Sequence, residues 1–285
     1  MLRDPDVDAV VVVTRRHATG PIVLDALGSG RHVFSEKPMA HTAAQARMLS
    51  EAAVARRLIY TVGYMKRHDA GVARAKAEIQ RIMADGSFGA TVSIRGWCLG
   101  GNVGGFDRDF VMTAEDRPDG LSVWPMGPVW LPASLLPSYD AFLNVNIHII
   151  NLLRFLIGTT PSVSSTRMRD DGTGVIALEF NGVPCILELA TTSFGAWNEG
   201  CEIRFERGLV KIELQPPFCM NAEAHVKLTG PKSKTLPEGQ TWAFRRQADA
   251  FVMDIVDRTT PLASGADSVI DLVTSEAIWR NHLKI

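Results

Sequence analysis

The sequence predicts an α/β fold that continues into an α+β fold: a partial parallel sheet, then an α/β domain with an open, mostly antiparallel sheet. Strand-like and helical segments alternate over residues 1–68, whereas short strands and turn signals dominate afterwards. The length of 285 residues suits two domains of about 150 residues each. We therefore expect one domain over residues 1–68 and a second over residues 69–285.

Three strands and two helices are expected in the first domain. The run Ala9–Thr14 is continuous and mostly β-branched, which is typical of a parallel strand buried on both faces. A helical pattern starts at Pro21, a residue suited to a first turn. The later elements are a strand over Arg31–Ser35, a helix through Ala43, Ala46, Leu49 and Ala52, and a strand over Leu58–Gly63. This spacing is typical of βαβ units and predicts a parallel sheet.

The chain after residue 68 has a different pattern. Asp69–Met83 is helical by periodicity, and Leu99–Ser138 is rich in Gly, Pro and Asp, which predicts a loop. Strands are expected over Ala90–Trp97, Ser162–Met168, Gly174–Phe180, Val183–Ala190, Glu202–Phe205, Leu209–Leu214 and Ala224–Leu228. Turn signals separate these strands, so they predict an antiparallel sheet. Two helices should end the chain, over Thr241–Arg258 and from Ser264 to Asn281.

Charge and cysteine content exclude several classes of function. Lys and Arg number 30 against 31 Asp and Glu, so we expect neither nucleic acid nor a membrane as a partner. The cysteines are Cys98, Cys185, Cys201 and Cys219. Because no C-x-x-C pair is present, they are interpreted as reduced thiols. The acidic N-terminus does not resemble a signal peptide, and no apolar run approaches the ~20 residues of a membrane span. We expect a cytoplasmic protein.

A lysine directly follows the second expected strand, in the sequence Ser35-Glu36-Lys37-Pro38. Ligands of open α/β sheets bind at the carboxyl ends of the strands, so this position favours a role for Lys37 in a site. Pro38 restricts the backbone of Lys37 and allows a cis peptide bond. The alternative interpretation is that Glu36 and Lys37 are a solvated pair of charges in a loop.

The segment Leu143–Ile157 predicts a helix that is apolar nearly all round, and therefore buried. Asn144, His148 and Asn151 form one polar stripe along it. Buried polar side chains without partners cost about 1–3 kcal/mol each, so the stripe should face a cleft, water or a ligand. A neutral histidine there has a pKa suited to accepting a hydroxyl proton. The alternative is a core histidine whose hydrogen bonds are satisfied.

Several motifs together resemble those of the Gfo/Idh/MocA oxidoreductases, which oxidise sugars and polyols with a nicotinamide dinucleotide. They are 4–11, Thr14, 30–38, 63–67, 86–89, the helix that carries His148, and 244–251. Residues 100–102 and 144–154 are most similar to a branch of the family that acts on glycosides. The resemblance implies a partial dinucleotide-binding, Rossmann-like domain over 1–68 and a substrate and oligomerisation domain over 69–285.

The resemblance also implies roles for individual residues. Lys37 and His148 would be catalytic: Lys37 would hydrogen-bond the reacting hydroxyl and the nicotinamide ribose, and His148 would accept the hydroxyl proton. The implied cofactor is NAD or NADP. The residues implied in cofactor binding are Thr14, His17, Glu36 and Lys37, and those implied in substrate binding are Asn144, Asn151, Tyr64 and Arg67. Arg67 is equally well interpreted as one side of a salt bridge at a strand end.

Three departures from the family pattern bear on this hypothesis. Asn144 stands where many relatives carry an aspartate, so an anionic partner that would raise the basicity of His148 is absent. Arg15 replaces a common proline. The sequence also lacks the G-x-G-x-x-G turn, so the chain is expected to be truncated relative to the family and to bind the cofactor weakly. The glycine-rich residues 100–105 do not substitute, because no helical pattern follows them.

Two functional hypotheses follow from the sequence. The first is an NAD(P)-dependent oxidoreductase that acts on a sugar, glycoside or polyol and forms a homo-oligomer through the sheet of the second domain. The second is a non-catalytic sugar-binding or interaction protein derived from that family. Metal-dependent chemistry is disfavoured, since the seven histidines show neither H-x-H nor H-E-x-x-H spacing.

Overall fold

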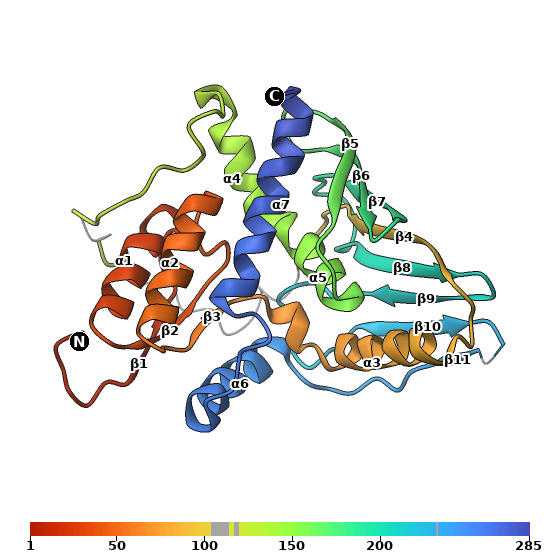
Figure 1. The fold of residues 1–285 in the computed structure, drawn as a ribbon, viewed down its shortest axis with the longest axis horizontal. Helices are drawn as coiled ribbons and strands as arrows, with labels where there is room; N and C mark the ends of the chain where they lie inside the picture. The colour runs from red at the N-terminus through yellow and green to blue at the C-terminus, as the bar shows by residue number, and fades with distance from the viewer. Residues whose placement is uncertain (104–113, 117–119, 232) are drawn as a thin grey trace. The chain divides into compact units, whose positions relative to one another are not determined.

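The computed structural model describes residues 1–103, 114–116, 120–231 and 233–285, and these form two compact units (Figure 1). Unit 1 consists of Met1–Tyr64, Val111–Ile147 and Gln247–Glu276, and unit 2 of Met65–Phe110, His148–Arg246 and Ala277–Ile285. The division expected after residue 68 differs from these units. Unit 1 also takes two later segments, because side chains such as Phe251 pack on its sheet, with the Phe251 and Phe34 rings 5.7 Å apart.

Unit 1 contains the expected parallel sheet. Its elements are β1 (Ala9–Val12), α1 (Arg16–Gly28), β2 (His32–Ser35), α2 (Ala43–Ala55) and β3 (Tyr60–Val62). The strands lie in the order β1-β2-β3, and both pairs are parallel. A reciprocal capping box between Thr42 and Gln45 starts α2. The sheet thus brings the carboxyl ends of β1, β2 and β3 to one edge, as the βαβ spacing predicted.

Strand β1 is buried on one face only, which corrects the expectation of burial on both faces. Val10 and Val12 are 5% exposed, whereas Val11 is 63% and Val13 is 69% exposed. Edge position alone is not the reason, because β3 is the other edge strand of the described sheet and is buried throughout. Described residues cover only the face of β1 that carries Val10 and Val12. A run of β-branched residues reports strand propensity and cannot show whether one or both faces of the strand are covered.

Helix α1 begins at Arg16, five residues before the expected start at Pro21. Pro21 therefore lies inside the helix, where it cannot donate a hydrogen bond to the carbonyl of His17. The backbone N–H of Trp124 donates to that carbonyl instead, at 2.9 Å. The Trp124 ring also occupies the space where a Cβ on Gly20 would lie. A residue about one hundred positions away thus makes the early start possible.

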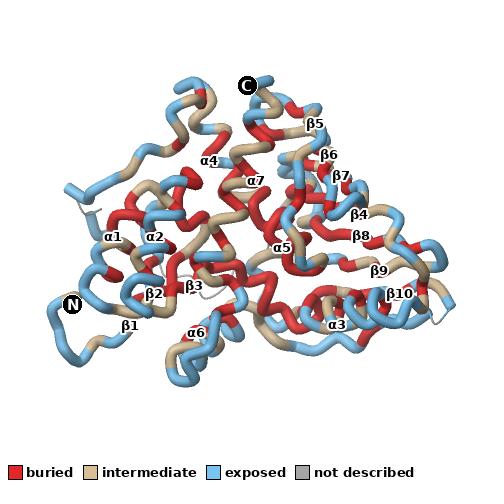
Figure 2. The backbone as a smooth tube through the Cα atoms, viewed as in Figure 1, coloured by how far each residue is buried: buried red, intermediate tan, exposed pale blue. Residues whose placement is uncertain are grey.

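The expected helix over Leu143–Ile157 is two helices, α4 (Leu136–Val145) and α5 (Ile147–Ile157), interrupted at Asn146. Asparagine is a weak helix former because its side chain competes for backbone hydrogen bonds. A short 3₁₀ helix, η2 (Ala133–Leu135), precedes α4, so the loop expected to Ser138 ends earlier. Residues 104–113 and 117–119 of that loop lie outside the described residues, as do 104 and 105 of its glycine-rich part. The expected burial of α5 is confirmed (Figure 2).

Unit 2 is built on a mostly antiparallel sheet, as the turn signals predicted. Its elements are η1 (Met65–His68), α3 (Ala70–Asp85), β4 (Thr91–Cys98), β5 (Ser162–Met168), β6 (Gly174–Phe180), β7 (Val183–Leu189), β8 (Glu199–Phe205), β9 (Gly208–Glu213), β10 (His225–Thr229) and β11 (Lys234–Thr235). The strand order is β11-β10-β9-β8-β4-β7-β6-β5, and among the described strand pairs of this sheet only β4–β7 is parallel. η1 and β11 were not predicted, since both are very short.

Two helices end the chain, α6 (Ala243–Asp257) and α7 (Gly265–Leu283), close to their expected ranges. The Ser264 hydroxyl accepts a hydrogen bond from the N–H of Asp267 at 3.2 Å and so caps α7. Ser264 also forms an antiparallel bridge with Thr61 of β3. No single helix of the described chain is long and apolar enough to cross a membrane, although Ala133–Val145 and Ile147–Ile157 reach the threshold when counted together.

A charged cluster fixes α4 within unit 1. Asp140 of α4 accepts hydrogen bonds from Arg16, with Nε to Oδ1 at 2.7 Å, and pairs with His41 at 2.9 Å. Burial alone would raise the pKa of the Asp140 carboxyl, but the hydrogen bonds from Arg16 and His41 outweigh it and hold the pKa below its usual range. The cluster joins three segments far apart in the sequence, and so no local pattern predicted it.

We expect Asp140→Asn to lower the free energy of unfolding near neutral pH by about 1–3 kcal/mol, because charge-assisted hydrogen bonds to Arg16 and His41 are lost. The pKa of Asp140 is lower in the folded than in the unfolded chain, so this contribution is present above pH ~4 and is lost as the pH falls further. Urea unfolding of the unchanged protein and of Asp140→Asn, measured at about pH 7 and about pH 3, should show that the difference in their free energies of unfolding is smaller at the lower pH. An equal effect from Asp249→Asn, an exposed carboxylate of α6, would contradict this account.

Candidate active site

Lys37 lies at the carboxyl end of β2, where the sheet topology predicted a site residue. The Lys37–Pro38 peptide bond is cis, and the Lys37 side chain is partly buried. Its ammonium group donates two hydrogen bonds to Asn144, at 2.6 Å to the backbone carbonyl and at 3.1 Å to Oδ1. The interpretation of Lys37 as a solvated loop charge is therefore wrong, because its amine is held in a fixed position inside unit 1.

The partner of Lys37 is the C-terminal end of a helix. Asn144 is in the last turn of α4, where backbone carbonyls have no partner within the helix. Such an end carries a partial negative charge, which favours a cation by about 0.3–1 kcal/mol. The Asn144 side chain adds a neutral acceptor at the same point. Lys37 is thus positioned by the helix end and an amide, without a carboxylate from Asn144.

Glu36 places a second ionisable group beside Lys37. Burial raises the pKa of the Glu36 carboxyl, and the nearby Lys37 partly offsets that rise. The backbone N–H of Lys37 donates to Glu36 Oε2 at 3.2 Å. A Cβ on Gly63, just after β3, would lie 3.3 Å from Glu36 atoms, so a side chain there would crowd the carboxyl. The Glu36 carboxyl is therefore enclosed at the same sheet edge as Lys37.

The remaining cofactor-binding candidates lie near the start of α1. Thr14 is exposed after β1, and its hydroxyl lies 3.1 Å from that of Thr19. His17 is partly buried in the first turn of α1, which begins after Arg15 without a side-chain cap. Tyr64, a substrate-binding candidate, is 1% exposed and is the last residue of the first segment of unit 1. Thr14, Glu36 and Lys37 all lie within two residues of the carboxyl ends of β1 and β2.

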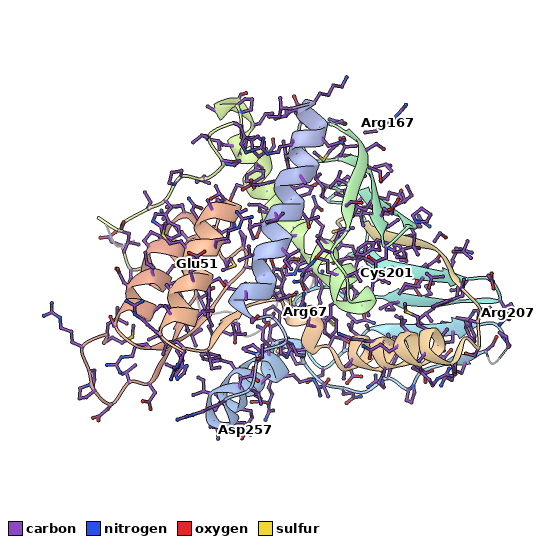
Figure 3. All side chains as sticks on the ribbon, viewed as in Figure 1. Glu51, Arg67, Arg167, Cys201, Arg207 and Asp257 are labelled. Carbon is purple, nitrogen blue, oxygen red and sulfur yellow. The ribbon has the colours of Figure 1, made fainter. Side chains whose placement is uncertain are left out.

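The other candidates belong to unit 2. His148 and Asn151 lie three residues apart on α5, hence on one face of that helix, and are 8% and 1% exposed. Arg67 of η1 is labelled in Figure 3. It donates from Nε to Asn151 Oδ1 at 2.7 Å, and its guanidinium lies 5.2 Å from the centre of the Phe155 ring. The polar stripe is therefore not on one helix: Asn144 ends α4, whereas His148 and Asn151 belong to α5, because the chain is interrupted at Asn146.

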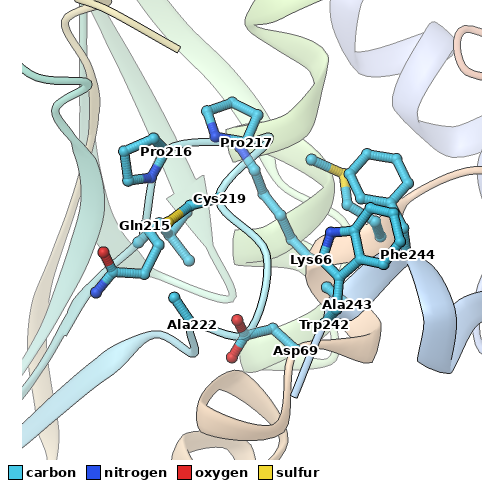
Figure 4. Close-up of a pocket in the computed structure, with 12 residues that line it drawn as sticks. Lys66, Asp69, Gln215, Pro216, Pro217, Cys219, Ala222, Trp242, Ala243 and Phe244 are labelled. Carbon is cyan, nitrogen blue, oxygen red and sulfur yellow. The ribbon is translucent and has the colours of Figure 1, made fainter. Parts of the chain in front are cut away.

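Sequence reasoning missed a second buried ion pair, between Lys66 and Glu199. The Trp197 indole N–H also donates to Glu199, at 2.9 Å. Lys66 and Asp69 line a small pocket of about 30 Å³ together with Gln215, Cys219, Trp242 and Phe244 (Figure 4). Lys66 could have been noticed beside Arg67, but its partner lies 133 positions away. Among the described residues, no group of three or more His, Cys, Asp and Glu could hold a metal ion.

The structure thus brings the predicted site residues together in two groups. Lys37 is joined to Asn144 and lies beside Glu36 in unit 1, and Arg67 is joined to Asn151 in unit 2. His148 follows Asn144 by four residues in the chain. The meeting of Lys37 with His148 stays a prediction.

The residues at the edge of the unit 1 sheet fit one half of a nicotinamide dinucleotide. The enclosed Glu36 carboxyl, the fixed Lys37 ammonium and the uncapped start of α1 offer polar groups for the nicotinamide and its ribose. The described residues do not provide the usual binding site for the pyrophosphate of the cofactor. Such a site is a glycine-rich turn that precedes a helix, and none is found in the described part of unit 1.

Comparisons with known proteins agree with this arrangement. The family described as "Oxidoreductase family, NAD-binding Rossmann fold" (Gfo/Idh/MocA) matches residues 1–64. Levoglucosan dehydrogenase of Pseudarthrobacter phenanthrenivorans is 25% identical over 166 residues, 58% of this chain and 37% of that protein. The scyllo-inositol 2-dehydrogenase (NAD(+)) of Bacillus subtilis is 31% identical over 159 residues, 55% of this chain and 37% of that protein. The matched chain spans just over a third of the length of these relatives.

Solved structures share the fold over almost the whole chain. KijD10, a 3-ketoreductase of Actinomadura kijaniata in complex with NADP and TDP-benzene, has a TM-score of 0.71 at 18% identity, covering 98% of this chain and 80% of that chain. The aldose-aldose oxidoreductase of Caulobacter crescentus, complexed with glycerol, has a TM-score of 0.72 at 21% identity, covering 99% and 79%. By these matches residues 1–64 resemble the Gfo/Idh/MocA oxidoreductase family, and the chain has the fold of these oxidoreductase structures.

Proposed function

We propose that the protein is an NAD(P)-dependent oxidoreductase that transfers a hydride between a nicotinamide and a hydroxyl-bearing carbon of a sugar, glycoside or polyol. The observation that carries the proposal is the Lys37 ammonium, held by Asn144 at the carboxyl end of β2 and beside Glu36. The named activities of the relatives, dehydrogenases of levoglucosan and inositol, support the substrate class. When bound, the nicotinamide supplies the acceptor for the hydride.

Lys37 has the chemistry needed to stabilise the reacting oxygen. As hydride leaves the carbon, negative charge develops on its hydroxyl oxygen, and an ammonium donor placed there stabilises that charge. The helix end and the Asn144 amide fix the position of Nζ before the substrate binds, so less ordering is required during the reaction. In the proposed mechanism Lys37 donates a hydrogen bond and keeps its proton throughout.

His148 is the proposed proton acceptor. Oxidation of an alcohol releases a hydride from carbon and a proton from oxygen, and a neutral imidazole accepts the proton near neutral pH. Asn144, four residues earlier, carries no charge, so it does not raise the basicity of this imidazole as an aspartate would. Asn151, Arg67 and Tyr64 are proposed to bind the substrate, and Thr14 and His17 the cofactor.

We also infer a cytoplasmic location and assembly into a homo-oligomer. The four cysteines are free thiols, which suits a reducing compartment. The sheet of unit 2 exposes apolar side chains on neighbouring strands, with Val175 and Ile186 each 42% exposed. Such side chains on a sheet face favour association with a second copy. Light scattering of a variant with Ile186→Lys tests this inference, since the added charge should reduce the measured mass.

Lys37→Met and His148→Ala should each lower kcat about 100-fold or more, because one removes the oxyanion donor and the other the base. Reduced nicotinamide is measured by absorbance with levoglucosan, scyllo-inositol or myo-inositol, at high concentrations of NAD+ and of NADP+. Lys227→Met, on the exposed side of β10, is the matched control and should leave the rate unchanged. The melting temperature of Lys37→Met should fall only slightly, because a charge at a helix end is worth about 0.3–1 kcal/mol.

Normal turnover in either variant would remove that residue from the mechanism. If the unchanged chain reduces neither cofactor with any of these polyols, the alternative of a non-catalytic sugar-binding protein replaces the proposal. Sugar binding by the chain, measured by calorimetry without cofactor, would then be the supporting observation for that alternative.

Asn144→Asp tests the electrostatic part of the mechanism. A carboxylate four residues before His148 should raise the pKa of the proposed base, so the acidic limb of the pH profile of kcat/KM should move to higher pH. Asn181→Asp, in the exposed turn between β6 and β7, introduces the same charge elsewhere and should leave the profile in place. A profile that does not move in Asn144→Asp would mean that position 144 does not influence the base.

A further inference from the structure

Unit 1 contains a second cavity, separate from the candidate active site. Its volume is about 240 Å³, and its walls come from the end of α2, the start of β3, the segment after α6 and the start of α7. Apolar side chains form much of the wall, and they are Ala53, Val54, Leu58, Ile59 and Pro261. Small-molecule pockets are typically about 300–1,000 Å³, so this cavity suits a ligand of a few heavy atoms.

Strand direction separates this cavity from Lys37. Tyr60 and the two residues before it line the cavity at the amino end of β3. Lys37 and Glu36 follow the carboxyl end of β2, which is parallel to β3. The two places are therefore at opposite edges of one sheet, and a ligand in the cavity would not belong to the proposed hydride-transfer site.

Positive charge gathers at one end of the cavity. Arg258 lines it and is exposed, so its guanidinium can reach a ligand from the solvent side. Gly265 and Ala266 in the first turn of α7 also line it, and no acceptor for their N–H groups is found among the described residues. Free N–H groups at the start of a helix of 19 residues attract an anion. Among the described lining residues there is no aspartate or glutamate; Asp267, in the same first turn of α7, is not one of them.

Close packing fixes the start of α7 at the cavity. A Cβ on Gly265 would lie 2.4 Å from the Tyr60 ring, so only glycine allows the helix to begin against this ring. Tyr60 is itself held, with its hydroxyl 3.0 Å from that of Ser35. The first turn of α7 is further tied to β3 through the bridge between Thr61 and Ser264. The amide donors of Gly265 and Ala266 are thus part of a rigid wall.

A hydroxyl on a largely buried residue opens into the cavity and points independently to a ligand. Ser50 of α2 lines the cavity and is only 9% exposed. No hydrogen bond partner for its hydroxyl is found within the described residues, whereas Ser264, which caps α7, and Thr259, which donates to Asp254 at 2.7 Å, both have one. The Ser50 oxygen is not itself enclosed by protein atoms, so its hydroxyl is available to a ligand in the cavity or to water that a ligand would displace.

We propose that this cavity binds a small carboxylate that carries a short apolar chain. The carboxylate accepts hydrogen bonds from the amides of Gly265 and Ala266 and pairs with Arg258, while the chain contacts the apolar wall. One guanidinium and one helix start balance a single negative charge better than the two charges of a phosphate. The Ser50 hydroxyl donates to the ligand from the other side. This inference is independent of the proposed oxidoreductase activity.

The test is NMR titration of the full 285-residue chain with three probes: butyrate, inorganic phosphate and butan-1-ol. Butyrate should shift the backbone amide signals of Gly265 and Ala266 in a saturable way. Butan-1-ol and phosphate, which each lack one half of the proposed ligand, should bind at least about tenfold more weakly. Phosphate binding as tightly as butyrate would show an anion site without a role for the apolar wall, and would overturn the proposal as stated.

Two variants and one control make the test specific. Arg258→Gln and Ser50→Ala should each weaken butyrate binding, the first by about tenfold and the second by severalfold. Arg47→Gln removes an exposed arginine from the same helix as Ser50 and should leave the affinity unchanged. Absence of saturable shifts at Gly265 and Ala266 in the unchanged chain, or equal binding in Arg258→Gln, would overturn the assignment.

Discussion

The candidate site depends on one contact, the pair of hydrogen bonds from the Lys37 ammonium to the last turn of α4. A lysine after a strand is ordinarily a mobile surface charge, with about 2 kcal/mol of rotamer entropy to lose on being fixed. Here a helix end and an asparagine side chain provide acceptors for its donors. The Asp140 cluster holds the same helix on Arg16 and His41, so the position of the amine is set by packing within unit 1 and is ready before any ligand arrives.

Helix ends recur as the sources of charge in unit 1. The C-terminal end of α4 attracts the cation at position 37, and the N-terminal ends of α1 and α7 offer N–H donors at opposite edges of the sheet. This division follows from the parallel strands, because every βα connection places a helix start at the carboxyl edge. The extra helix α7 enters beside β3 through the Ser264 bridge and so places its start at the other edge. The small sheet therefore has polar groups at both edges: Lys37 and the start of α1 at the carboxyl edge, and the start of α7 at the amino edge.

Much of the fold could be predicted from local patterns. The hairpin strands β5 and β6 have the expected bounds, and the burial of α5 follows from its uniform apolarity. The expectations that were wrong concern features that depend on residues far away in the sequence. Pro21 is tolerated inside α1 because the N–H of Trp124 satisfies the carbonyl of His17, and Val11 is exposed because described residues cover only the opposite face of β1. The contact of Lys37 with Asn144 spans 107 positions; the strand-end rule placed Lys37 at a site, but no periodicity could have named its partner.

The most direct test of the central claim is NMR of the Lys37 ammonium group in isotopically labelled protein. If the group is held by α4, its protons exchange slowly with water, and a scalar coupling across the hydrogen bond connects Nζ to the Asn144 carbonyl carbon. In Asn144→Ala, which keeps the carbonyl but removes the side-chain acceptor, the coupling should persist while proton exchange becomes faster. Exchange as rapid as at exposed lysines such as Lys227, with no coupling to Asn144, would contradict the account.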